Sequence, residues 1–82
     1  MNTQDISTAS QRARLLTALK STPGGITTIQ ARRDLNVMQP APRIKELRER
    51  GCQIATIRET QTDDQGRKHP RCARYVYLGG GV

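Results

Sequence analysis

The sequence contains few of the residues that stabilise small secreted or metal-binding proteins. It has two cysteines, Cys52 and Cys72, and one histidine, His69. Two cysteines are too few for the disulfide framework of a small secreted scaffold, so we expect both thiols to be reduced. Neither cysteine is spaced with His69 or with a further cysteine as in a zinc finger. The sequence therefore predicts no metal site and no cofactor.

Catalytic motifs and long apolar segments are also missing. The chain has no glycine-rich phosphate loop, no Ser-His-Asp set and no pair of carboxylates placed to act together, so we expect no enzymatic activity. A membrane-spanning helix needs about 18 or more apolar residues in a row, and no such run is present. Residues 1–10 lack the basic-then-apolar order of a secretion signal. We therefore expect a soluble cytoplasmic protein with no membrane partner.

Aromatic side chains are scarce, and acidic side chains are outnumbered by basic ones. Two tyrosines without Phe or Trp leave no stacking platform for RNA or single-stranded nucleic acid. In contrast, 14 Lys and Arg stand against 7 Asp and Glu, which gives a formal net charge of +7 on 82 residues. Excess positive charge attracts polyanions, and arginine binds phosphate and guanine with paired hydrogen bonds. The composition favours double-stranded DNA as the partner, with a merely solvated basic surface as the alternative.

The spacing of apolar residues predicts two short helices in the first half of the chain. The first covers residues 8–20, where leucines recur at helical spacing, and it ends before Pro23. The second covers residues 28–35, and Thr27 or Thr28 is its N-cap.

Two prolines mark the start of a third helix. Pro40 and Pro42 lack an N–H group and have φ fixed near the helical value, so a first helical turn tolerates them. Gly51 is a stop signal, which places this helix at residues 39–50. Only about four residues connect it to the second helix, so the two helices cross steeply as in a helix-turn-helix unit.

After Gly51 the apolar pattern changes to the two-residue period of strands. Residues 52–60 and 71–78 each alternate, and the polar segment between them has a turn signal at Asp64-Gln65-Gly66. We therefore predict an antiparallel hairpin at the end of the chain.

All of these elements fit one domain of the α+β class, a three-helix head followed by an antiparallel β-hairpin. We place this domain at residues 8–78, because the chain is too short for a second core. The polar residues 1–7 and the segment GGGV at 79–82 have little with which to hold a structure, so we expect both ends to be flexible.

The order of helix, tight turn, helix with RIKELRERG and hairpin ending in RYVYLGG resembles the small winged helix-turn-helix domains frequent in bacteriophage and prophage genes. The resemblance covers about residues 8–79. It implies that the third helix reads DNA and that the hairpin is a wing. It also implies a phage or prophage transcriptional regulator or accessory factor that binds double-stranded DNA in a bacterial or phage-infected cell.

The polar face of the third helix contains the predicted base contacts. On a helical wheel, the buried stripe consists of Pro40, Ala41, Ile44 and Leu47, with the Arg48 stem at its edge and its guanidinium in water. The N-terminal end of a recognition helix enters the major groove. There, glutamine bonds adenine, arginine bonds guanine, glutamate accepts from cytosine and a proline ring lies against a thymine methyl group. At the i,i+4 spacing, Glu49 is expected to pair with Lys45.

The segment after the hairpin turn is a second basic element. Residues 67–74 hold four cations and no acid, which predicts phosphate contacts, with protection of an exposed strand edge as the alternative. The full set of predicted DNA contacts is Thr28, Gln39, Pro42, Arg43, Lys45, Glu46, Arg50, Arg67, Lys68, His69 and Arg71.

Another class of function stays open at this point. Winged helices also serve as adaptors, so a protein-interaction module, such as a phage-encoded modulator of a host enzyme, is the alternative to DNA binding. No long heptad or spare apolar helix is present for a dimer seam, which leaves a monomer or a DNA-assembled dimer.

Overall fold

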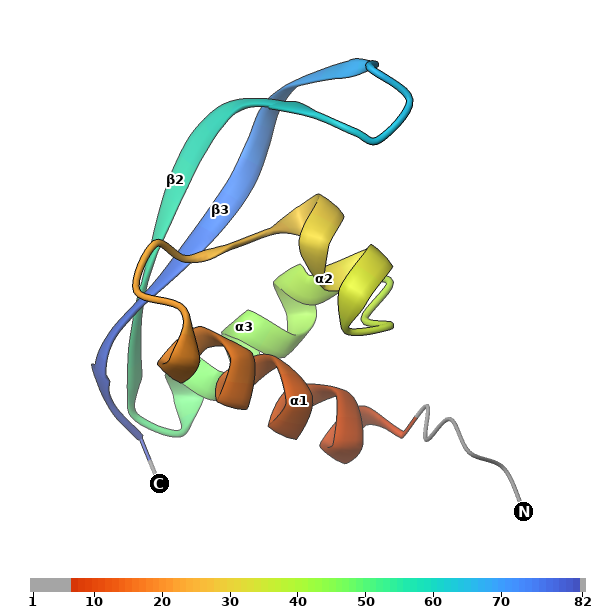
Figure 1. Cartoon of the computed structure of the whole chain (residues 1–82). Coiled ribbons are helices and arrows are strands. Elements are labelled where there is room, and N and C mark those ends of the chain that lie inside the picture. The colour runs from red at the N-terminus through yellow and green to blue at the C-terminus, as the bar shows by residue number, and fades with distance from the viewer. Residues whose placement is uncertain (1–6, 82) are drawn as a thin grey trace.

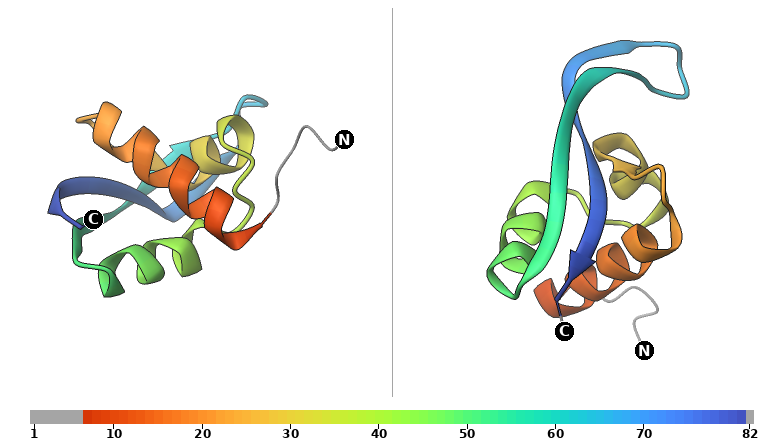
Figure 2. Two further views of the ribbon diagram at one scale, coloured as in Figure 1. Left: turned by 90° about the horizontal axis from the view of Figure 1, so that it is seen from below. Right: turned by 90° about the vertical axis from the view of Figure 1, so that its left-hand side faces the viewer.

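The computed structural model describes residues 7–81, and its helices cover one face of an antiparallel sheet (Figure 1). The sheet has the strand order β1-β3-β2. Figure 2 (right) shows the sheet in front of the helices. The predicted α+β class is confirmed. The elements in chain order are α1 (Thr8–Ser21), β1 (Ile26–Thr27), α2 (Thr28–Asp34), α3 (Pro40–Glu49), β2 (Cys52–Thr62) and β3 (Lys68–Gly80).

The helix starts follow from local hydrogen bonds. The Ser7 hydroxyl caps α1 by accepting from the Ser10 N–H at 3.1 Å. At α2, the Thr27 hydroxyl accepts from the Gln30 N–H, and the Gln30 side chain accepts from the Thr27 N–H, which forms a capping box. Ser7 thus belongs to the domain, one residue before its predicted start. The predicted flexibility of residues 1–6 lies outside the described residues.

The core confirms most of the predicted stripe of α3 and corrects one position. Ile44, Leu47 and Pro40 are buried, but Ala41 is exposed. On the helical wheel, Pro40 and Leu47 both fall on the same side of Ile44, so the stripe is centred on that side. Arg43 is consequently drawn inward and Ala41 is turned to the surface.

The hairpin of β2 and β3 bends at a bulge. Glu59 pairs with Cys72 and Gln61 pairs with His69, so two residues of β3 oppose one residue of β2. Arg71 lies in this bulge with φ of 57°, a left-handed conformation. Both cysteines are free, as expected. In Figures 1 and 2 the tip of the hairpin bends over α2.

The tip itself is organised by one carboxylate. Asp63 Oδ1 accepts from the N–H groups of Gln65 and Arg67, both at 2.9 Å. Gly66 has φ of 79°, which the predicted turn requires.

The segment after Leu78, which the sequence predicts to be flexible, begins with two strand residues. Gly79 and Gly80 belong to β3 and pair with Gln53 and Cys52. The Tyr77 hydroxyl donates to the Gly80 carbonyl at 2.6 Å. Glycine is needed here because Gly80 has φ of 78°, and a Cβ at this residue would lie 2.5 Å from the Gly51 carbonyl oxygen. The absence of a side chain at Gly80 therefore allows β3 to approach the Gly51 carbonyl closely.

The variant Gly80→Ala is expected to lower the free energy of unfolding by about 1–3 kcal/mol, because it combines a left-handed φ with the clash against Gly51. Gly24→Ala is the control, since a Cβ at Gly24 meets nothing within 4 Å. Urea unfolding of both variants checks this prediction. Equal stability of the two variants would show that the end of β3 does not contribute to folding.

Candidate nucleic-acid interface

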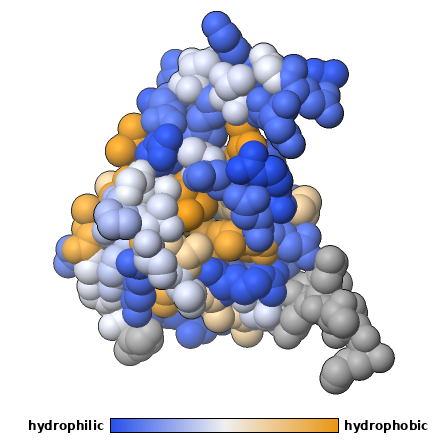
Figure 3. All heavy atoms as spheres, in the orientation of Figure 1, coloured by the Kyte–Doolittle hydropathy of each residue, from blue (hydrophilic) through white to orange (hydrophobic). Residues whose placement is uncertain are grey.

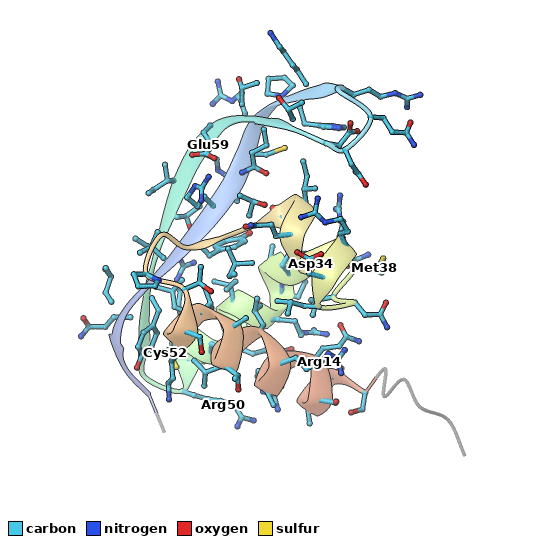
Figure 4. The ribbon with its side chains drawn as sticks, in the orientation of Figure 1. Arg14, Asp34, Met38, Arg50, Cys52 and Glu59 are labelled. Atoms are coloured by element: carbon cyan, nitrogen blue, oxygen red, sulfur yellow. The ribbon has the colours of Figure 1, made fainter. Side chains whose placement is uncertain are left out.

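The start of α3 presents an exposed surface that includes three apolar residues. Met38 is 54% exposed, and Gln39, Ala41 and Pro42 are also exposed. Figure 4 shows Met38 at the outer edge of the connection between α2 and α3. Lys45 lies exposed one turn further along the helix. This end of α3 is therefore open to a partner, as the sequence predicts for Gln39, Pro42 and Lys45.

Arg43 and Glu46 lie elsewhere than the sequence predicts, because they attach α3 to α1. Glu46 forms ion pairs with Arg12 and with Arg43, each at 2.9 Å, and Arg43 also approaches the Thr8 hydroxyl at 3.5 Å. The side chains of Arg12, Arg43 and Glu46 are only 16%, 17% and 29% exposed. The Arg12 hydrogen bond, followed by that of Arg43, holds the pKa of Glu46 below its ordinary value of 4.5.

A second attachment fixes the other side of α3. Arg48 donates from Nε and Nη2 to the Ile54 carbonyl and from Nη2 to the Thr56 hydroxyl. Its guanidinium therefore binds β2 while the residue is exposed, so the structure adds these contacts to the predicted exposure. Within residues 7–81, Lys45 and Glu49 do not form the predicted ion pair, so Lys45 is unpaired.

A groove runs between α2, the start of α3 and the hairpin. Its volume is about 430 Å³. Helix α2 contributes Thr28 and Arg32, and the hairpin contributes Arg58 and Arg71. The Thr28 hydroxyl donates to the Ala73 carbonyl at 3.2 Å, so it ties α2 to β3. The residues that α3 and the position before it contribute are Gln39, Pro40, Ala41 and Pro42.

The surplus charge of the chain is concentrated on a few unpaired side chains. The carboxylates of Asp34, Glu46, Glu59 and Asp63 all have cationic or histidine partners. Six cationic side chains have no hydrogen bond, ion pair or ring contact within residues 7–81, and two of them line the groove. The six are Lys45, Arg50, Arg58, Arg67, Lys68 and Arg71.

Arg32 and Arg58 line the groove without having been predicted from the sequence. A signal for Arg58 was present, because the two-residue period of β2 puts it on the same face as the buried Ile54. No comparable signal marked Arg32. Its Nε donates to the Met38 carbonyl at 2.8 Å, a contact that depends on the course of the connection after α2.

Seven predicted contacts do not line this groove: Arg43, Lys45 and Glu46, described above, and Arg50, Arg67, Lys68 and His69. Arg50 is at the opposite end of α3 from Met38 (Figure 4), beside an apolar hollow against α1. Arg67, Lys68 and His69 follow the hairpin turn, where hydrophilic side chains cover the top of the molecule (Figure 3).

The His69 ring is engaged within the hairpin tip. His69 Nε2 lies 2.9 Å from Asp63 Oδ2. This hydrogen bond, followed by that of the Arg67 N–H, holds the pKa of Asp63 below its ordinary value of 3.8. Asp63 and His69 also line a hollow with Arg32 and Arg33 of α2, so the tip lies against that helix.

Two further observations concern residues 7–81 as a whole. No helix in this part of the chain has the length and apolar character to cross a membrane. Nor do three or more His, Cys, Asp or Glu side chains gather there as a metal ion would require.

The Glu46 ion pairs predict a pH dependence of stability. Because the pKa of Glu46 is lowered by folding, its contribution is fully present above pH 4.5 and is lost as the pH falls through the lowered pKa. Glu46→Gln should therefore melt below the wild type at neutral pH, and the two melting temperatures should converge as the pH falls below the lowered pKa of Glu46. Glu49→Gln, which removes an unpaired carboxylate, is the control. A difference for Glu46→Gln that does not change with pH would contradict the assignment.

Comparison with known proteins gives one finding. The family model of the winged helix-turn-helix domain matches residues 10–78. No significant match was found among curated proteins or solved structures. The matched segment includes most of α1, all of α2 and α3 and nearly the whole hairpin. The chain belongs to the family of winged helix-turn-helix domains, a DNA-binding fold.

Proposed function

We propose that this protein binds double-stranded DNA. The start of α3 enters the major groove of the DNA, and Arg58 and Arg71, which line the groove of the protein, contact the DNA phosphates. The observation that carries the proposal is the position of these two unpaired arginines next to the exposed Gln39. A recognition helix needs base-contacting side chains at its N-terminal end and cations at its flanks, and this surface supplies both.

Individual roles follow from the chemistry of the side chains. Gln39 offers the amide that bonds adenine, and Lys45, Arg58 and Arg71 provide charges for phosphates. Arg67 and Lys68 at the hairpin tip, and Arg50 at the far end of α3, are proposed as additional phosphate contacts.

Other predicted contacts acquire supporting roles. Thr28 holds α2 against β3, and His69 braces Asp63 in the turn. Base contact by Arg43 and Glu46 stays a prediction, and it requires their ion pairs to open. In the arrangement described, these two side chains position α3 on α1.

The biological role that we propose is that of a transcriptional regulator or accessory factor of a phage or prophage. A single small basic domain that binds DNA as a monomer, or as a dimer assembled on DNA, suits this role. Protein binding is the second candidate function. The observation that favours it is the exposure of Ile57 and Leu78, at 46% and 63%, on the hairpin.

A salt series tests DNA binding by the groove. Each phosphate contact releases counterions, so Arg58→Ala and Arg71→Ala should each flatten the plot of log affinity against log salt concentration by about one unit. Lys20→Ala is the charge-matched control, because Lys20 lies over the Tyr77 ring and does not line the groove. Identical slopes for Lys20→Ala and the groove variants would contradict phosphate contacts by Arg58 and Arg71. Duplex binding too weak to measure would contradict the proposed function itself.

A further inference from the structure

The arginine and the glutamate in the first two turns of α3 are not free to read G·C pairs, and Lys45, which can also bond guanine, lies one turn further along the helix. Arginine is the usual reader of guanine and glutamate accepts from cytosine. Arg43 and Glu46, the residues of these types in the first two turns, are engaged with each other and with Arg12. Before Arg43 or Glu46 could contact a base edge, these ion pairs would have to break.

Side chains suited to A·T pairs are displayed at the same end. Gln39 is exposed and has the amide that bonds both edge atoms of adenine. Met38, Ala41 and Pro42 are exposed apolar residues beside it. Thymine differs from the other bases in the major groove by its methyl group, which apolar side chains recognise.

The backbone of the first turn of α3 is also poorly suited to binding phosphate alone. Pro40 and Pro42 remove two of the N–H groups that a first helical turn normally presents to anions. Positive charge comes instead from the flanks, where Arg32 lies on α2 and Arg58 and Arg71 lie on the hairpin. An apolar centre between cationic flanks is complementary to a thymine-lined groove floor between two phosphate backbones.

We infer that this protein recognises A·T pairs in duplex DNA and that Met38, Ala41 and Pro42 contact thymine methyl groups. The inference rests on the proposed function and specifies the DNA that the same surface reads. The charged flanks favour DNA over a protein ligand for this apolar surface, since a protein partner would have to bury or neutralise the unpaired arginines.

The test begins with selection of tight-binding duplexes from a random-sequence pool. The selected duplex is then synthesised with uracil in place of thymine, which removes only methyl groups and keeps base pairing and phosphate charge. Affinity should fall by about four-fold for each contacted methyl group, the equivalent of about 0.8 kcal/mol. Equal affinity for the thymine and uracil duplexes would overturn the inference while leaving DNA binding intact. Failure of any duplex to bind would overturn the proposed function as well.

A variant assigns the effect to the apolar residues. The double variant Met38→Ser, Ala41→Ser should lose most of the preference for thymine over uracil, while Leu78→Ser, which changes an equally exposed apolar residue on the hairpin, should keep it. All three positions are exposed, so the variants should remain folded. Retention of the full preference by the double variant, as expected if the surface binds a protein, would overturn the assignment.

Discussion

The rotation of α3 about its own axis is the constraint on which the rest of the structure depends. Ile44 anchors the helix in the core, the contacts of Glu46 with Arg12 and of Arg43 with Thr8 hold one side to α1, and Arg48 holds the other side to the Ile54 carbonyl. Because α3 is attached on both sides, it cannot rotate, and only one of its faces is open to a partner. It is the outer face that begins at Met38 and continues to Lys45.

Most of the fold was predictable because strong local signals marked its boundaries. The prolines at 40 and 42 and the turn at residues 63–67 act through nearest neighbours, so their effects do not depend on packing. The inward position of Arg43 was not predictable from one helical wheel, since it depends on Thr8 and Arg12 of α1, which contact Arg43 and its partner Glu46. The bulge at Arg71 was not predictable either. A bulge arises when one strand has an extra residue relative to the strand it pairs with, and the pairing is known only from the structure.

The site was predictable only where its residues lie close together in the sequence. Gln39, Pro42 and Lys45 lie on one helix, and helical periodicity alone predicts that they share an open face. Arg32 and Arg58 reach the same surface from α2 and β2, so only the tertiary structure brings them together. The net charge indicated a polyanion as partner, and the structure adds where the unpaired cations lie.

Mapping the DNA-contacting surface residue by residue shows whether the start of α3 and the adjoining groove bind the duplex. When a selected duplex is titrated into the isotope-labelled protein, the account predicts that the largest amide chemical-shift changes fall on residues 38–45 and next to Arg58 and Arg71. Lys20 and Leu78, which do not line the groove, should change little. Changes concentrated at Lys20 and Leu78, with residues 38–45 unaffected, would contradict the account.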